Sequence, residues 1–563
     1  MRIMKYVLAL VFALGLAIPS FAVELSLGGF PSFMRFRWRT LHNATYHNIL
    51  TPGELANLGG GLDADTTGEN LHFADMTLRL TPQLVLSDAV TIRASIDVLS
   101  NAIAGGATGG LFGEDSDGSE TGGVVMDDLR YTDRFNGVLL WGDDAVSDNY
   151  GSFSVKYLHA DINLGNKGFI RLGRQPFDFA MGLYANGGHD PYSDGGFNID
   201  RLLWLKGYST PLGATTLVLV SDYIGGGSDK TAAATSTASS ARNDSFALFD
   251  GNGQTVDYLA AAVIINNGAL TYGAYWFPYI EQNNMHIAGT TNNIDMAFQL
   301  YSAYAEYKTS DYRFIAEATG GYGELDPGYG TDMLTVERDN YVAAARLELF
   351  NAAPFTTVSL EAGISPGDED NTAAGDNGYE GSIIRGNGAY QLDNLLFKHV
   401  IPTLYQRSGS IINAKYLKAD ADYAVGNGDN LNLAVIMAWV ENKKPADQSI
   451  GANAGGSDGV AGSIGGYYGT EYEATYSMNL VDGVELSLIG SYIDTGSGLK
   501  DALIAQAYAN TTGMRAASLL DTEDSIWGFQ SRLLIFIDDF FKAPAASKSV
   551  SYTHLTLPTI YSV

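Results

Sequence analysis

The sequence predicts an all-β protein, a closed antiparallel β-barrel that crosses a membrane. Three observations carry this prediction. Residues 33–39 alternate between apolar and arginine side chains, and alternate residues of a strand point to opposite faces of a sheet. Similar alternating segments recur along the chain, and their connections alternate between short and long. After the first 22 residues, no segment approaches the ~20 apolar residues of a membrane-spanning helix, so a membrane form must be a barrel.

The two ends of the chain are predicted to lie outside the barrel. Residues 1–22 read as a secretory signal peptide, with Arg2 and Lys5 before an apolar core and Ser20-Phe21-Ala22 as the cleavage site. A retained anchor is the alternative. Residues 550–563 resemble the translation of a sequencing adaptor and are predicted to be non-native; a genuine unstructured tail is the alternative. The barrel domain is therefore expected over residues 23–549.

Composition excludes several classes of protein. The chain has no cysteine, which excludes disulfide scaffolds and the attachment of a c-type haem. Its formal net charge of -30 disfavours nucleic acid as a partner. The 66 glycines and 33 tyrosines suit a barrel with glycine-rich loops and girdles of aromatic side chains.

About 18 strands are expected from the alternating segments, in even number so that both chain ends return to the same side of the membrane. They cover residues 24–41, 71–86, 89–99, 152–164, 168–176, 197–208, 213–223, 255–266, 269–281, 294–308, 311–322, 338–350, 355–365, 408–425, 430–441, 467–480, 484–495 and 523–537. Sixteen is the alternative count. Segment 408–425 is long, and the loop before it could contain a further pair.

The connections support the membrane barrel. Short turns such as 165–167, 267–268, 309–310 and 481–483 contain Gly, Asn, Asp and Ser at hairpin spacing. The long loops include 42–70, 100–151, 177–196, 224–254, 366–407 and 496–522. Short turns on one side and long loops on the other are typical of bacterial outer-membrane barrels.

The energetic cost of burying charge in lipid assigns the faces of each strand. An arginine facing lipid at mid-membrane costs ~2–4 kcal/mol, so three in one strand would cost ~6–12 kcal/mol. Arg35, Arg37 and Arg39 are therefore expected to face the lumen, with Phe36 and Trp38 facing lipid. The same test places Asp75, Arg79, Arg93, Asp97 and Arg532 inward.

Closing the barrel brings the first and last strands together. The arginines on those neighbouring strands are then expected to form one basic arc lining the pore: Arg35, Arg37, Arg39, Arg79, Arg93 and Arg532. Other strands carry mixed charges inward, including Glu306, Glu317, Lys418 and Asp420. Such linings tune the selectivity of a pore. The alternative is that these residues only solvate the wall and pair with each other.

Residues 169–176, Phe-Ile-Arg-Leu-Gly-Arg-Gln-Pro, follow a tight turn and precede loop 177–196. Here the chain resembles the bacterial general porins, which often carry a Leu-Gly-Arg-Gln-like strand before the loop that folds into the pore. The resemblance covers the leader, the strand rhythm and this stretch. It implies a homotrimeric, water-filled channel of the Gram-negative outer membrane, in contact with lipid and lipopolysaccharide, whose third long loop narrows the pore.

The same resemblance makes Asp178, Asp190 and Asp194 the acids of the constriction, opposite the arginine arc. The chain also departs from the general porins. It is longer than a typical member, and loop 100–151 could be the inward-folded loop instead.

No catalytic or cofactor site is expected. Asp115 to Glu120 only partly matches a calcium-binding loop. The eight histidines lack metal-ligand spacing, and no nucleophile elbow or phosphate loop occurs. Phe541 is a candidate for the terminal Phe of the barrel. The sequence thus predicts a passive channel for small hydrophilic solutes, with a specific channel for sugars or organic anions as the alternative. An aromatic slide of Tyr157, Tyr304 and Tyr416 would favour that alternative; a barrel enzyme or a secreted adhesin is the remaining one.

Overall fold

The fold is known from a computed structural model. The structure describes residues 24–27, 30–42, 70–104, 154–193, 196, 198–225, 255–286, 293–326, 334–336, 341–367, 389–401, 411–426, 428–443, 464–502 and 525–538. The predicted signal peptide, residues 105–153 with the calcium-like stretch, Phe541 and the C-terminal tail lie outside these ranges.

The described residues form one antiparallel sheet of 21 strands. The strands are β1 Glu24–Leu27, β2 Phe33–His42, β3 Asn70–Leu80, β4 Pro82–Ser87, β5 Val90–Ala104, β6 Ser154–Asn163, β7 Phe169–Pro176, β8 Asn198–Thr210, β9 Gly213–Gly225, β10 Thr255–Asn267, β11 Leu270–His286, β12 Asn293–Lys308, β13 Tyr312–Asp326, β14 Leu334–Val336, β15 Tyr341–Phe350, β16 Thr357–Ser365, β17 Ala414–Gly426, β18 Asp429–Val440, β19 Tyr467–Val481, β20 Val484–Thr495 and β21 Ser525–Phe536.

The sheet closes on itself, because β2 pairs with β3 on one side and with β21 on the other. Three strands share a barrel position with the strand next to them in sequence: β1 with β2, β4 with β3 and β14 with β15. The barrel therefore has 18 strand positions, as the alternating segments predict, and not 16. Counted around the barrel, β2 is position 1, β13 is position 11 and β21 is position 18.

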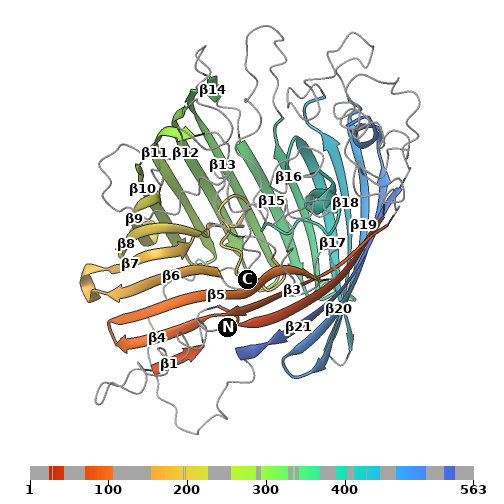
Figure 1. The fold of residues 1–563 in the computed structure, drawn as a ribbon, viewed down its shortest axis with the longest axis horizontal. Coiled ribbons are helices and arrows are strands. Elements are labelled where there is room, and N and C mark those ends of the chain that lie inside the picture. Colours follow the sequence, from red (N-terminus) through yellow and green to blue (C-terminus); the bar gives the residue numbers. More distant parts are fainter. Residues whose placement is uncertain are drawn as a thin grey trace, which may run out of the picture.

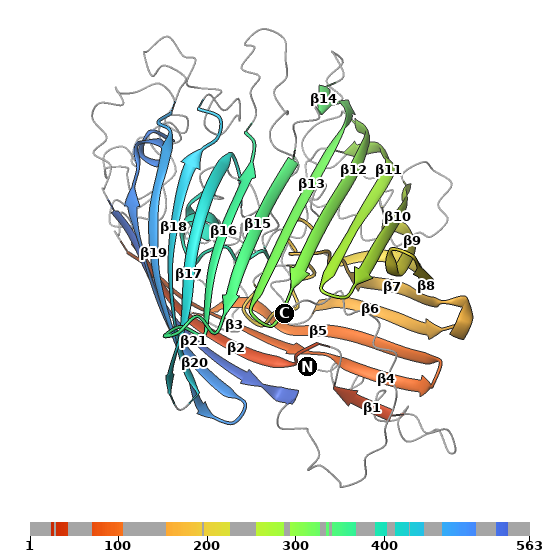
Figure 2. The ribbon, with the colours of Figure 1, turned by 180° about the vertical axis from the view of Figure 1, so that it is seen from behind.

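The loop before β17 was considered as the place of a further strand pair, but its described residues contain no strand. β17 begins at Ala414 rather than at residue 408, and residues 389–401 before it include a single π-helical turn, Leu396–Val400. The orange and red strands β2–β5 cross the lower front of Figure 1, and the upright strands β12–β19 form the wall that faces the viewer in Figure 2.

The outward face is apolar. Large side chains that are exposed include Leu158, Leu172, Leu219, Leu360, Leu433 and Leu488 between the two rims, with Tyr208, Tyr307, Tyr312 and Tyr423 close to the short turns and Trp276, Tyr472, Tyr492 and Trp527 toward the other rim. A band of aliphatic side chains between two aromatic girdles matches the surface that membrane barrels present to lipid. Among the described residues, no helix is both long enough and apolar enough to span a membrane.

The short turns follow the residues that the sequence offers. In the turn between β10 and β11, Gly268 has a φ of 67°, a left-handed conformation that only glycine adopts without strain. Gly483, between β19 and β20, has a φ of 76°. Both positions were expected to be turns.

Candidate functional site

The arginines of β2 point into the barrel. Arg35, Arg37 and Arg39 are 1%, 2% and 5% exposed, whereas Phe36 and Trp38 between them are 36% and 53% exposed. The predicted assignment of the two faces of this strand is therefore confirmed.

The arc arginines meet acids on the neighbouring strands. Arg37 Nε donates to Asp75 Oδ1 at 2.8 Å, and Arg39 lies 3.6 Å from the same carboxylate. Arg79 makes a bidentate pair with Asp97, at 2.7 and 3.0 Å. Asp75 and Asp97, expected as separate lumen residues, are thus the partners of the arc. A bidentate guanidinium–carboxylate pair fixes the orientation of both side chains.

Residues 177–193, the first inward segment, lie against this arc. Arg35 Nη1 donates to the carbonyl oxygens of Pro191 and Ser193 at 2.8 and 2.7 Å. Arg79 Nη1 donates to Gly188 O at 2.8 Å. Four of the six arc arginines are at most 5% exposed, so they lie behind the segment rather than open to the lumen. Their effect on solute selectivity stays a prediction.

Aromatic contacts extend the attachment to β20 and β21. The guanidinium carbon of Arg532 lies 4.2 Å from the centre of the Tyr192 ring, and the Tyr192 hydroxyl donates to Glu485 Oε2 at 2.9 Å. An arginine over an aromatic face is favourable. The last strand of the barrel thus helps to hold the segment.

The other end of the first inward segment is attached to the far wall. Glu317 of β13 is 2% exposed, and its Oε2 accepts hydrogen bonds from the backbone N–H groups of Met181 and Leu183 at 2.8 and 3.2 Å. Phe177 and Phe179 pack against Tyr275 of β11 at centroid distances of 5.4 and 4.6 Å. Since β13 is position 11 and β2 is position 1 of 18, the segment crosses the full width of the barrel.

The acids expected at the constriction have different surroundings. Asp178 Oδ1 accepts the Gly187 N–H at 2.6 Å, and its Oδ2 lies 3.3 Å from His189 Nε2. Asp190 is exposed and accepts the Tyr192 N–H at 2.8 Å. Asp194 lies outside the described residues. Asp178 and Asp190 therefore order the segment internally, and their contact with a passing solute stays a prediction.

Residues 389–401, the second inward segment, were not anticipated from the sequence. Lys418 Nζ of β17 donates to Leu392 O at 2.7 Å, and the Tyr390 hydroxyl donates to Glu361 of β16 at 2.7 Å. The Phe397 ring lies 5.6 Å from that of Tyr416. The apolar run Leu395-Leu396-Phe397 inside a polar loop was the signal that could have revealed it.

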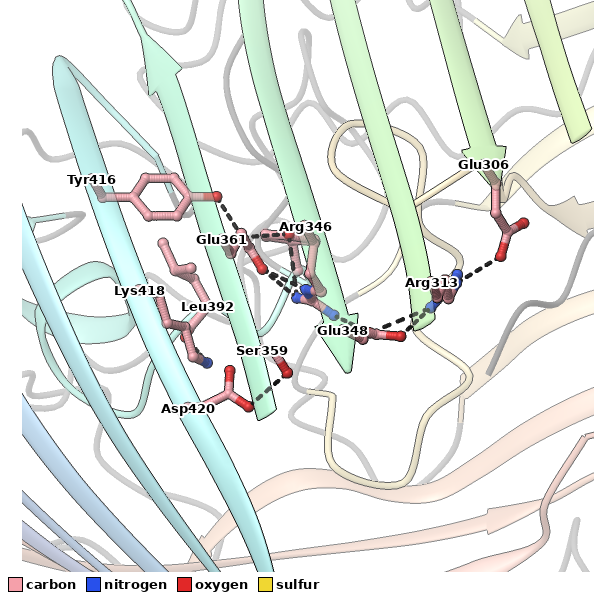
Figure 3. A network of polar contacts seen from close by, with 11 residues as sticks. Glu306, Arg313, Arg346, Glu348, Ser359, Glu361, Leu392, Tyr416, Lys418 and Asp420 are labelled. Atoms are coloured by element: carbon pink, nitrogen blue, oxygen red, sulfur yellow. Dashed lines mark hydrogen bonds and ion pairs between the residues drawn. The ribbon is translucent and has the colours of Figure 1, made fainter. Parts of the chain in front are cut away.

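A row of charged side chains follows the inner wall from β12 to β17 (Figure 3). Arg313 donates to Glu306 at 2.6 Å and lies 3.4 Å from Glu348, while Arg346 lies 2.5 Å from Glu361. The row continues through Ser359, Lys418 and Asp420, with a hydrogen bond of 3.0 Å from Ser359 to Asp420. Charges of opposite sign pair across the strands, and the row has four carboxylates to three cations, so this wall carries about one net negative charge.

A second charged group faces that row. Arg93 and Arg171 both bind Asp161, at 3.1 and 2.7 Å, and their side chains are 29% and 23% exposed. They lie on β5 to β7, positions 3 to 5, and the row on β15 to β17 occupies positions 12 to 14 of 18. Two arginines on one aspartate leave about one net positive charge, opposite a mixed wall.

The other side chains singled out from the sequence are buried and pack against their neighbours. His159 is 2% exposed beside Asp161, and Tyr157 and Tyr416 are buried at 2% and 3%. Tyr304 packs against Phe179 at 5.0 Å. Tyr157, Tyr304 and Tyr416 face inward as expected, but they contact wall or inward-segment side chains. Within the described ranges, no group of three or more His, Asp or Glu is placed to hold a metal ion.

Comparison with known proteins finds likeness at the level of architecture. No protein-family model and no curated protein matches the sequence. OccK8 (OprE) of Pseudomonas aeruginosa is 12% identical, with a TM-score of 0.40, and the match covers 91% of this chain and 97% of that one. The anion-selective porin of Comamonas acidovorans is 11% identical, with a TM-score of 0.35 over 91% and 99% of the two chains. The outer membrane channel DcaP of Acinetobacter baumannii is 10% identical, with a TM-score of 0.33 over 91% and 97%.

Proposed function

We propose that this chain is a porin of the Gram-negative outer membrane, through which small hydrophilic solutes and ions diffuse passively. The observation that carries the proposal is the first strand of a closed barrel, whose arginines face inward while Phe36 and Trp38 lie on an apolar outer face. Only a barrel with lipid outside and polar surroundings inside makes both faces favourable. No residue of this proposal acts as a catalyst.

The first inward segment forms the constriction in this proposal. Because Arg35 and Arg79 of the arc donate to its carbonyl oxygens, these two arginines act as positioning residues. The partly exposed pair Arg93 and Arg171 then acts on passing ions, with Arg346 and Asp420 on the opposite wall. The net positive charge of this pair lies opposite a wall with about one net negative charge, so we expect the selectivity to be weak and the two partly exposed arginines to favour anions.

The membrane environment and the assembly state are part of the proposal. The aliphatic band and its aromatic girdles support contact with lipid and with the core of lipopolysaccharide. A homotrimer is expected from the resemblance to general porins, and cross-linking of the detergent-solubilised protein tests it.

Ion conduction through a planar bilayer tests the proposed function. The purified protein should give stepwise conductance, and a salt gradient should give a reversal potential of the sign for anion preference. Arg93→Gln should reduce the anion-to-cation permeability ratio by about twofold, because a partly exposed charge acts through a water-like dielectric.

Arg174→Gln is the matched control. Arg174 pairs with Asp200 at 2.8 Å and is 51% exposed on the outward face, so its loss should leave the permeability ratio unchanged. Absence of conductance steps, or an equal effect of the two variants, would contradict the proposal.

A substrate-specific channel is the second candidate. Buried aromatic side chains, including Phe179 and Phe397, attach both inward segments to the wall, and two fixed segments inside the barrel favour discrimination by shape. Block of the ionic current by one class of sugar or organic anion, at concentrations where other classes have no effect, would distinguish it from the general pore.

A further inference from the structure

The second inward segment is attached to the wall by its backbone N–H groups. The Asn394 N–H donates to Glu473 Oε1 at 2.5 Å, and the Leu396 N–H donates to Glu471 Oε2 at 2.7 Å. Both acceptors belong to β19. Within the segment, the N–H groups of Phe397 and Lys398 donate to the two oxygens of Asp393, at 2.6 and 3.0 Å. Three carboxyl groups therefore hold one short stretch of chain.

These three carboxyl groups are buried together. Asp393, Glu471 and Glu473 are 7%, 0% and 8% exposed, and each of the other two acts electrostatically on Glu471. Oε1 of Glu471 is buried and accepts no hydrogen bond from the described residues. Ionised carboxylates that share a buried site repel one another, so this arrangement is sensitive to the protonation of its members.

Charged residues of the wall and of the segment surround these carboxyl groups. Lys418 of β17 is the cation that acts on Asp393, and its ammonium already donates to Leu392 O. On β16, Glu361 is paired with Arg346 of β15. Lys398 and His399 lie on the segment itself, where His399 is 6% exposed. Because Asp393 lies on the segment and Glu471 and Glu473 lie on the wall, ionisation of Asp393 adds repulsion between the segment and the wall.

We propose that the second inward segment is a proton-controlled gate. It docks against β16, β17 and β19 while Asp393 is protonated, and it leaves this wall when Asp393 ionises and is repelled by the carboxyl groups of Glu471 and Glu473. The docking equilibrium does not depend on the proposed function. The further inference that undocking widens a conducting lumen rests on the proposed function.

The direction of the response follows from Asp393. Burial and the neighbouring Glu473 raise the pKa of Asp393 from 3.8 to about 7. The docked state then binds the proton more tightly than the undocked state does. Docking is therefore strongest in acid and weakens as the pH rises between about 4 and 7, by at most about tenfold in the docking equilibrium per pH unit for one group.

A spin label on the segment tests the docking equilibrium directly. The chain has no cysteine, so Gln391→Cys gives a single labelling site at an exposed position of the segment. In detergent micelles, the electron paramagnetic resonance spectrum should show an immobilised label at pH 4 and a growing mobile component up to pH 8. An unchanged spectrum across this range would overturn the proposal.

Glu471→Gln in the labelled background separates the carboxyl group from general effects of pH. The amide oxygen can still accept the Leu396 N–H, and the new NH₂ group can donate to Asp393 or Glu473. The label should then stay immobilised up to pH 8. Asp429→Asn is the control, because Asp429 binds Tyr476 away from the group and should leave the pH response intact. A full pH response in Glu471→Gln would contradict the proposal.

Conductance in a bilayer tests the gating role. The unlabelled protein should conduct at least twofold more at pH 8 than at pH 4, and Glu471→Gln should abolish this difference. Conductance that is equal at both pH values, while the label moves, would overturn the gate. A label that moves with pH in a protein that never conducts would support the docking equilibrium and contradict the proposed function.

Discussion

The two inward segments occupy the same lumen but are held by opposite kinds of contact. The first receives guanidinium N–H groups on its carbonyl oxygens, from Arg35 and Arg79. The second offers its own N–H groups to the carboxyl groups of Glu471 and Glu473. In both cases the wall supplies the charged partner and the segment supplies the backbone.

The difference lies in how the charge of each anchor is balanced. Arg37 and Arg79 are each matched by an aspartate on the next strand, and guanidinium groups stay protonated at every physiological pH. The carboxyl groups beneath the second segment are crowded against one another. A barrel can therefore carry one permanent constriction and one element whose position depends on proton binding.

Removing an arc arginine should have the largest effect on the first segment. Arg79→Met leaves Asp97, which is 0% exposed, with Lys156 at 3.7 Å as its remaining cationic partner. Breaking a buried pair in this way costs ~3–5 kcal/mol. The free energy of unfolding in urea, measured with the protein refolded into lipid vesicles, checks the loss.

Arg174→Met provides the comparison for that variant. Its ion pair with Asp200 lies on the outer face, directed away from the first inward segment, so we expect its loss to leave the attachment of that segment unchanged. If the two variants lose equal stability, the arc is not the permanent anchor that the comparison assumes.

Glu317 is an exception among the anchors of the first segment, because it holds the far end of that segment with a carboxylate instead of a guanidinium group. Glu317→Ala leaves the N–H groups of Met181 and Leu183 without their acceptor, at a cost of ~1–3 kcal/mol. Glu317→Gln keeps one acceptor oxygen and should recover about half of the loss. Urea unfolding of both variants measures this, and equal losses would show that a neutral acceptor of the same size cannot replace the carboxylate.

The smallest expected effect concerns His189 in the first segment. Burial lowers the pKa of His189 below 6.5, although Asp178 opposes this shift. The docked segment then binds the proton less tightly than the undocked segment, so its docking is favoured above pH 6.5 and weakens in acid. The second segment responds in the opposite direction.

His189→Phe tests this opposition. Phenylalanine keeps the stacking on Phe30, now at 3.7 Å between ring centroids, and removes the titration. Between pH 8 and pH 5, the free energy of unfolding should fall less in the variant than in the unmodified protein. The difference between the two decreases should be under ~1 kcal/mol. Urea midpoints at the two pH values check the difference. An identical pH dependence in both proteins would show that His189 does not contribute to it.

The sequence by itself determined the barrel and the direction of the side chains in β2, and it predicted about 18 strands with 16 as the alternative; the structure decided for 18. These properties follow from a period of two residues and from the cost of an arginine in lipid, and both can be evaluated within one strand. The sequence also indicated that loop 177–196 folds inward, through the resemblance of the strand before it.

Only the tertiary structure decided which partners those side chains meet. Arg35 reaches Pro191 across 156 positions of sequence, and Leu396 reaches Glu471 across 75. No local pattern encodes such a distance, because the contact exists only after the barrel has closed and both segments have folded into it. The same holds for the carboxyl groups of Asp393 and Glu473, which look like ordinary solvated acids until one loop brings them together.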